Sequence, residues 1–183
     1  MTDQTPRVQL LLTGNEIMSG DTVDSNSAMI AKRLDELAIG IYRKVTVGDD
    51  PALLQQELTA MAANADLIIV NGGLGPTVDD LTAEILAAAA KVSLQEHPQA
   101  IAHLQQWCAG RNLELNAANL KQAMLPEGCQ IVDNPIGSAV GFEMNMDGCR
   151  IICTPGVPSE LAAMLDIIVA SLAAEREQPV ERN

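Results

Sequence analysis

Three strand–loop–helix units follow one another in the first half of the chain, and this order restricts the fold more than any other feature. Apolar runs at residues 7–13, 41–47 and 67–70 each lead into a polar or glycine-containing loop and then into a segment with apolar residues at helical spacing. Consecutive units of this kind build a mostly parallel sheet, because right-handed crossovers place each helix against a face of the sheet. The sequence therefore predicts an α/β fold with three layers and helices on both faces of the sheet.

The regular alternation ends after a helix expected at residues 81–90. Two further helices are expected at residues 98–109 and 117–124, with no apolar strand between them. We interpret this part of the chain as an insertion beside the edge of the sheet at which a ligand would bind.

Three short strands, near residues 130–132, 139–144 and 150–153, are expected to complete the sheet. Asp147 and Gly148 stand between the last two strands. An Asp-Gly pair between apolar runs predicts a hairpin.

A final helix is expected to start at Pro158 and to run through Leu172. The chain has 183 residues, of which 48% are apolar, and this length and composition suit one domain with a substantial core. We therefore expect one domain over residues 1–172 and a flexible, charged tail over residues 173–183.

The formal net charge of −13 opposes binding to the phosphate backbone of nucleic acids. A single Trp, Tyr and Phe leave few platforms on which unpaired bases could stack. No apolar run has membrane-spanning length, and no basic and apolar leader precedes the first strand. We expect a cytoplasmic protein with no nucleic acid and no membrane as partners, whose four cysteines, which form no C-x-x-C pair, are buried reduced thiols.

A glycine-rich loop with two adjacent carboxylates follows the third strand. Gly72, Gly73 and Gly75 have no Cβ, so the backbone can turn sharply there and bring N–H groups close to an anion. Asp79 and Asp80 come next, and if one of them caps the following helix, the other is left for a different task. A phosphate-binding turn beside two carboxylates suits a divalent cation held against a nucleotide phosphate. A glycine turn followed by an acidic helix cap is the alternative interpretation.

Polar residues also follow the first and second strands, whose carboxyl ends would lie at the same edge of a parallel sheet. Glu16 and Asn26 flank the loop after the first strand, and Asp49 follows the second strand. Asn26 and Asp49 have an alternative interpretation as helix caps. Their shared edge is where ligands characteristically bind in α/β proteins.

Later segments add candidate nucleotide-binding residues. Gly137 and Ser138 are small enough to lie against a ligand, and the segment from Gly156 to Glu160 would place backbone N–H groups at a helix N-terminus, which binds anions. Lys121 could balance phosphate charge, and a solvated lysine on a helix surface explains it equally well.

Taken in order, these segments resemble the N-terminal domain of the CinA family of competence- and damage-inducible proteins, which is related to molybdopterin-binding domains. The resemblance covers residues 7 to about 172 and rests on seven ordered motifs. They are Gly14-x-Glu16 with Gly20, Asp24-Ser25-Asn26, Gly48-Asp49, residues 72–82, Asn119-x-Lys121-Gln122-Ala123, residues 134–142 and residues 155–160.

The resemblance implies a MogA-like molybdopterin-binding fold and, for CinA-type domains, hydrolysis of the pyrophosphate of ADP-ribose or a related dinucleotide. It implies a divalent metal (Mg²⁺, Mn²⁺ or Co²⁺), assistance by potassium, a small nucleotide ligand and a homo-oligomer, either a dimer or a trimer. CinA proteins often continue into a nicotinamide mononucleotide deamidase domain. We expect no deamidase activity from this chain, because the residues after 172 are too few to form that domain.

On this interpretation Asp80, Asp79 and Glu16 bind the metal, and Asp80, Asp79 and Asp49 are the catalytic residues. The nucleotide-binding candidates are Gly72, Gly73, Gly75, Thr77, Asn26, Lys121, Gly137, Ser138, Gly156 and Glu160. Two alternatives stay open: a pterin-processing domain of molybdenum cofactor biosynthesis, which shares the fold, and a nucleotide-binding module without catalysis.

Overall fold

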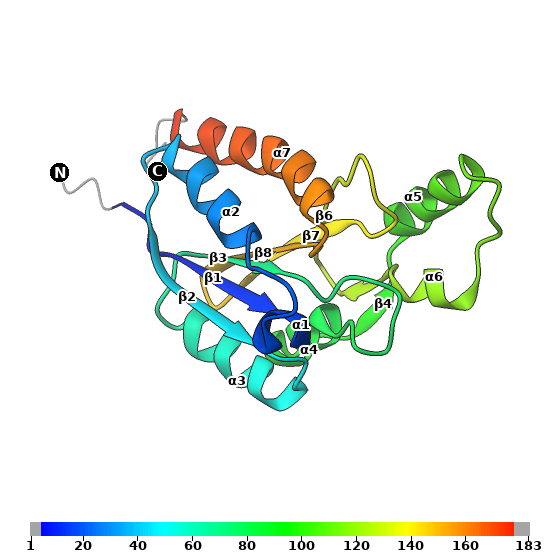
Figure 1. The fold of residues 1–183 in the computed structure, drawn as a ribbon, viewed down its shortest axis with the longest axis horizontal. Coiled ribbons are helices and arrows are strands. Elements are labelled where there is room, and N and C mark those ends of the chain that lie inside the picture. Colours follow the sequence, from blue (N-terminus) through cyan, green and yellow to red (C-terminus); the bar gives the residue numbers. More distant parts are fainter. Residues whose placement is uncertain (1–4, 178–183) are drawn as a thin grey trace.

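A six-stranded sheet with the order β2-β1-β3-β8-β7-β6 forms the centre of the computed structural model, which describes residues 5–177 (Figure 1). Strands β2, β1, β3 and β8 are parallel, whereas β7 and β6 are antiparallel to their neighbours. The strands are β1 Val8–Thr13, β2 Ile41–Val47, β3 Leu67–Asn71, β6 Gln130–Val132, β7 Gly141–Met146 and β8 Cys149–Thr154. The prediction of a mostly parallel α/β sheet is confirmed.

Helices cover both faces of the sheet, which gives the three predicted layers (Figure 1). One face carries α2 (Asn26–Asp35) and α7 (Pro158–Glu177), and the other carries α3 (Pro51–Ala62) and α4 (Thr82–Ala90).

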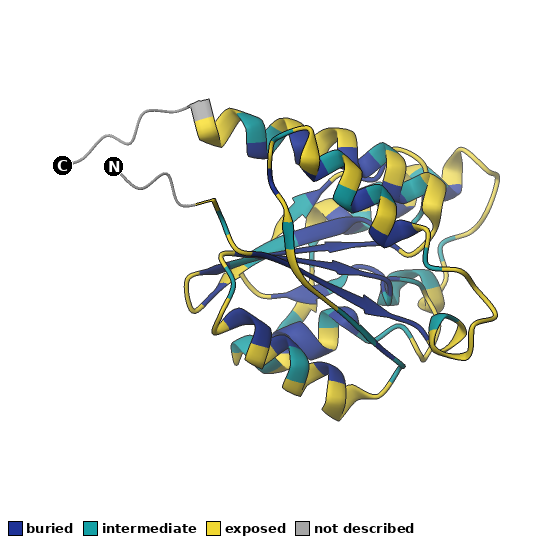
Figure 2. Ribbon diagram, turned by 60° about the vertical axis from the view of Figure 1, so that its left-hand side comes forward, coloured by how far each residue is buried: buried dark blue, intermediate teal, exposed yellow. Residues whose placement is uncertain are grey.

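The apolar core lies on both sides of the sheet, because successive side chains of a strand point to opposite faces. In β1, Leu10 and Leu12 belong to the core cluster under α2 and α7, whereas Leu11 belongs to the cluster under α3 and α4. Figure 2 shows the central strands as buried and the outward surfaces of the helices as exposed. Within residues 5–177, no helix combines the length and the apolar character that a membrane span requires.

The insertion between α4 and β6 differs from the prediction in two details. It contains α5 (Pro98–Ala109), as expected, but the next helix, α6 (Ala117–Lys121), stops before residue 124. Two short strands that were not predicted, β4 (Leu94–Glu96) and β5 (Met124–Pro126), pair in antiparallel fashion at the base of the insertion. Strands of three residues are too short for alternation to be recognised, and the same applies to the single turn of α1 (Asn15–Ser19) in a loop predicted as irregular.

The hairpin between β7 and β8 is confirmed. Its turn residues Asp147 and Gly148 have φ angles of 53° and 86°, and positive φ at both positions is the requirement of a type I′ turn.

The prediction that the tail begins at residue 173 is wrong, because α7 continues to Glu177. Side-chain contacts hold its last turns: Arg150 Nη1 lies 2.7 Å from Glu175 Oε1, and Arg176 donates to the carbonyl of Leu37. Glu175 and Arg176 are therefore exposed residues at the end of the helix, and the remainder of the predicted tail, residues 178–183, lies outside the described residues.

Candidate functional site

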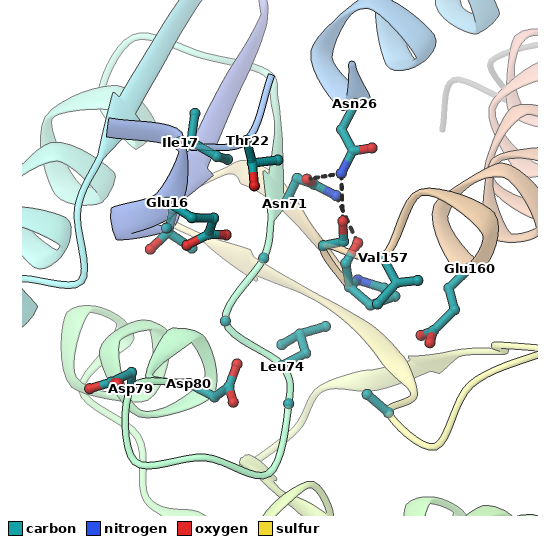
Figure 3. A pocket seen from close by; sticks show the side chains of 18 of the residues that line it. Glu16, Ile17, Thr22, Asn26, Asn71, Leu74, Asp79, Asp80, Val157 and Glu160 are labelled. Atoms are coloured by element: carbon teal, nitrogen blue, oxygen red, sulfur yellow. Dashed lines mark hydrogen bonds between the residues drawn. The ribbon is translucent and has the colours of Figure 1, made fainter. Parts of the chain in front are cut away.

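A pocket of about 640 Å³ opens at the carboxyl ends of the parallel strands, between the loops that follow β1, β2, β3 and β8. This is the edge predicted from the strand–loop–helix order. Most of the predicted site residues line the pocket: Glu16, Asn26, Asp49, Gly72, Gly73, Gly75, Thr77, Asp79, Asp80, Ser138, Gly156 and Glu160. In Figure 3, Glu16, Asp79 and Asp80 lie on one side of the view, and Glu160 lies on the other.

A network of amide side chains joins three of the loops at the base of the pocket (Figure 3). Asn71, the last residue of β3, donates to Thr154 Oγ1 (3.0 Å) and to the carbonyl of Pro155 (2.9 Å). Asn26 donates to Asn71 Oδ1 (2.9 Å) and to the carbonyl of Gly156 (2.8 Å). Asn26 is therefore a residue that connects loops and not the cap of α2, whose cap position is occupied by Ser25.

Asp49 is held between the first two strands. Its Oδ1 accepts from Thr13 Oγ1 (3.0 Å), its Oδ2 accepts from the N–H of Asn15 (3.2 Å), and its own N–H donates to Asn15 Oδ1 (3.0 Å). The cap of α3 is the neighbouring Asp50, which accepts from the N–H of Leu53. Asp49 is consequently free of the capping role that was its alternative interpretation.

The glycine-rich loop needs its glycines for its own packing. Gly73 has a φ of 71°, and a Cβ at this position would collide with Thr82 Oγ1. The N–H of Gly72 already donates to the carbonyl of Thr154, so it does not point freely at a ligand. The N–H groups of Gly73, Leu74 and Gly75 make no hydrogen bond within residues 5–177, and they remain as donors for an anion.

Asp80 closes a tight turn over residues 77–80. Its Oδ2 accepts from the N–H of Thr77 (2.8 Å) and from Thr77 Oγ1 (2.7 Å), and its N–H donates to the carbonyl of Thr77 (3.2 Å). Neither Asp79 nor Asp80 caps α4, because the cap position is Leu81 and no side chain there accepts from the helix. Both carboxylates are thus left for tasks other than the predicted capping.

The pocket wall has a one-sided charge. Six carboxylates line it, and none of the described lining residues is Lys, Arg or His. The six are Glu16, Asp24, Asp49, Asp79, Asp80 and Glu160. Like charges at this density make the wall attractive to cations and repulsive to an uncompensated anion.

Besides Asp49 and Asp80, two more of these carboxylates have structural partners. Partial burial opposes ionisation of Asp24, but hydrogen bonds from the side chain and backbone of Ser27 and the ammonium group of Lys44 outweigh it, so the pKa of Asp24 lies below its ordinary value. Glu160 Oε2 accepts from Asn134 Nδ2 at 2.8 Å.

The metal-binding prediction needs a divalent cation, and the donor set suits one only in part. Within residues 5–177, no three His, Cys, Asp or Glu side chains gather closely enough to hold a metal ion by themselves, so Glu16, Asp79 and Asp80 do not form a ready-made cage. Mg²⁺ usually takes only one or two carboxylates and completes its shell with water and ligand phosphate. Asp80 Oδ1 accepts no hydrogen bond from the described residues, so this smaller arrangement fits the site.

The comparisons with known proteins agree with this geometry. Residues 9–174 match the family described as "Probable molybdopterin binding domain". The structure of the protein CinA from Thermoplasma acidophilum is 30% identical in sequence, has a TM-score of 0.84, and aligns over 92% of this chain and 98% of its own length. The chain belongs to the CinA-like family of molybdopterin-binding domains.

Two further relatives of the CinA-like domain are longer proteins. A CinA-like protein from Colwellia psychrerythraea is 58% identical over 171 residues, which are 93% of this chain and 40% of that protein. A protein of Shewanella oneidensis named nicotinamide-nucleotide amidohydrolase PncC is 43% identical over 159 residues, which are 87% of this chain and 38% of that protein. The chain thus spans about two-fifths of the length of these relatives.

The molybdopterin biosynthesis enzyme MoaB from Thermus thermophilus shares the fold of the CinA-like domain. It has a TM-score of 0.64 over 93% of each chain, at 20% sequence identity. The MogA-like fold prediction is therefore confirmed.

Two predicted site residues of the CinA-like domain do not line the pocket. Lys121 lies in a small adjoining cavity, where its ammonium group donates to the carbonyls of Thr77 and Asp80. Gly137 donates to Asn134 Oδ1 and packs directly against Glu160, so its lack of a Cβ serves the packing of its loop. Both positions are explained by neighbouring chain segments, which sequence spacing does not reveal.

Sequence reasoning missed six polar residues on the pocket wall: Thr13, Thr22, Asp24, Ser25, Asn71 and Gln122. Thr13 and Asn71 end buried strands with a polar side chain at the ligand-binding edge, and this position was a usable signal. Gln122 stood within a quoted motif, but its contact with the glycine-rich loop depends on the fold of the insertion.

Proposed function

We propose that this CinA-like domain hydrolyses the pyrophosphate bond of ADP-ribose or a related dinucleotide with the help of a divalent cation. The proposal rests on the pocket wall, where carboxylates without a cationic side chain lie beside backbone N–H groups that have no partner among the described residues. The pocket volume of about 640 Å³ also falls in the range of small-molecule sites.

The two kinds of group on the wall suit a ligand that carries both signs of charge. Backbone N–H groups bind oxyanions, and carboxylates repel them. A pyrophosphate that enters together with a divalent cation would satisfy both, because the cation would compensate the charge of the carboxylates while the N–H groups donate to the phosphates. A cation is thus a condition for binding as well as for chemistry.

Asp80, with Asp79 and Glu16, would hold this cation, which when bound lowers the pKa of a water molecule and neutralises charge on the phosphates. The N–H groups of Gly73, Leu74 and Gly75 would donate to phosphate oxygens, and Asp49, fixed by Thr13, would accept a hydrogen bond from water. Attack by a water oxygen on one phosphorus breaks the bond to the bridging oxygen, which leaves on the other phosphate. ADP-ribose then gives AMP and ribose 5-phosphate.

A substrate panel tests the proposal. Purified protein is incubated with ADP-ribose, NAD, FAD, coenzyme A or nicotinamide mononucleotide, each with Mg²⁺, Mn²⁺ or Co²⁺, in potassium and in sodium buffers. We expect release of a mononucleotide from ADP-ribose that EDTA abolishes and potassium increases.

If no dinucleotide in the panel is cleaved, the proposal is overturned. Ammonia release from nicotinamide mononucleotide would assign to this chain the activity named for its Shewanella oneidensis relative. Light scattering on the same sample tests the homo-oligomer, which we propose to be a dimer or a trimer.

A further inference from the structure

The end of α6 contacts the acidic side of the pocket from behind. Lys121 Nζ donates to the carbonyls of Thr77 and Asp80, and Gln122 Nε2 lies 3.4 Å from the carbonyl of Leu74. Three backbone carbonyls of the glycine-rich and acidic loop are therefore held by two consecutive residues of the insertion.

The two carbonyls that Lys121 bridges are the first and last of the turn that Asp80 closes. The side chain of Asp80 accepts from the N–H and the hydroxyl of Thr77, so the carboxylate and the turn are one unit. An ammonium group that bonds both ends of the turn restricts its opening, and it thereby restricts where the Asp80 carboxylate can lie.

Lys121 is itself on a stable support. Asn116 and Asn119 form a capping box at the start of α6, in which Asn116 Oδ1 accepts from the N–H of Asn119 at 2.9 Å. Lys121 is half-buried, and it lines a small cavity together with Asp80, Glu84 and Leu125, whereas it does not line the larger pocket. Its ammonium group is directed at the protein backbone.

We propose that Lys121 is a positioning residue that fixes the turn over residues 77–80 and so presents the carboxylate of Asp80 to the cation. The part of the inference that concerns the cation rests on the proposed function. The restriction of the turn by Lys121 is independent of that function. The inference replaces the prediction that Lys121 contacts the nucleotide phosphate.

The direction in which cation affinity changes on loss of Lys121 distinguishes a positioning role from an effect of its charge alone. Removing a positive charge near carboxylates makes the local potential more negative, so a lysine that acts only through its charge would weaken cation binding, and its loss would tighten it. A lysine that fixes the turn has the opposite effect, because its loss lets the Asp80 carboxylate move away from the binding position.

The experiment compares Lys121→Met and Lys121→Arg with the parental chain. Lys32→Met is the matched control, since Lys32 is an exposed lysine of α2 whose loss changes the net charge equally. Hydrogen exchange of the Thr77 and Asp80 amides, which donate within the turn, is measured without metal or nucleotide, and Mn²⁺ binding is measured by direct titration without nucleotide. ADP-ribose affinity is then measured at saturating Mn²⁺.

In Lys121→Met we expect exchange of these amides to be about tenfold faster and the Mn²⁺ dissociation constant to be about fivefold higher or more, since hydrogen bonds to a charged donor are lost. Lys32→Met should match the parental chain. Lys121→Arg keeps the charge and donors that reach carbonyls, so it should lie between the two in both measurements.

Unchanged exchange in Lys121→Met, or tighter Mn²⁺ binding, would overturn the inference. An unchanged Mn²⁺ affinity with weaker ADP-ribose binding would also overturn it and would make Lys121 a phosphate ligand. If the parental chain binds Mn²⁺ but cleaves no dinucleotide, the proposed function fails while faster exchange and weaker Mn²⁺ binding still support the positioning role. If the parental chain binds no Mn²⁺ at all, the metal part of the inference is wrong.

Discussion

Asp80 combines a structural and a proposed chemical task in one side chain. Its Oδ2 holds the turn through Thr77, and its Oδ1 accepts no hydrogen bond from the described residues. A carboxylate can do both, because its two oxygens offer about four acceptor sites. The neighbouring Asp79, which also lines the pocket, is exposed and makes no hydrogen bond within residues 5–177.

Asp80→Asn should remove catalysis with little loss of stability. The amide keeps the shape and one acceptor for the turn but lacks the charge that binds the cation, so we expect the rate of ADP-ribose cleavage at subsaturating Mg²⁺ to fall by about a hundredfold or more. The melting temperature should fall by less than about 4 °C. Asp35→Asn, at an exposed position of α2, controls for the change of charge. A variant that retains the parental rate would remove Asp80 from the metal site.

Gly73→Ala should destabilise the fold through a steric collision. Gly128→Ala is a matched control, because Gly128 has a similar positive φ of 83° but open space where a Cβ would stand. Both substitutions should cost about 1 kcal/mol for the left-handed backbone, and Gly73→Ala should cost about 1–3 kcal/mol more because Thr82 must move. Urea unfolding measures the difference, and equal losses in the two variants would contradict the packing described for Gly73.

The N-terminus of α2 is the element on which pH should act most directly. Asp24 precedes the helix and accepts from the N–H of Ser27, and Lys44 reaches it from β2 at 3.2 Å. The pKa of Asp24 lies below its ordinary value, because these bonds outweigh the opposing effect of partial burial. A depressed folded pKa stabilises the protein above the ordinary pKa of 3.8, and this contribution is lost as the pH falls through the folded value.

We therefore expect carbon-detected NMR titration of the Asp24 carboxyl group to give a pKa below 3.8. Lys44→Met should raise this pKa towards the ordinary value, because it removes both a hydrogen bond and a favourable charge, whereas Lys32→Met should leave it in place. An Asp24 that titrates identically in both variants would show that Lys44 does not contribute.

Across the whole molecule, the sequence predicted the features that depend on residues close together in the chain. The bounds of α5 followed from Pro98 and the apolar spacing behind it, and the edge at which the pocket opens followed from three consecutive strand–loop–helix units. Lys121 and Gly137 were misplaced because their partners, the carbonyls of the acidic loop and the side chain of Glu160, come from distant segments. Spacing along the chain carries no information on such contacts.

The charge of the whole pocket predicts that metal and nucleotide stabilise the protein together. A pyrophosphate meets six carboxylates unless a cation accompanies it. Mg²⁺ and ADP-ribose together should therefore raise the melting temperature by about 5–10 °C at saturating ligand, which is more than the sum of their separate shifts. A melting series with each ligand and with both measures this coupling, and Asp80→Asn should weaken it. Strictly additive shifts would contradict a shared site, and a larger shift with a molybdopterin precursor would favour cofactor assembly.

The position of β8 in the sheet has a consequence for folding of the protein during its synthesis. This strand is synthesised after β1, β2 and β3, yet it pairs with β3 in the middle of the sheet, and its Thr154 accepts from Asn71 at the base of the pocket. A nascent chain that has emerged only as far as residue 140 therefore exposes one side of β3 as an unpaired edge, which invites aggregation, and it lacks one wall of the pocket. The proposed nucleotide binding should begin during translation only when the segment from Thr154 to Glu160 has emerged. Binding by a nascent chain would therefore show that β8 has paired with β3.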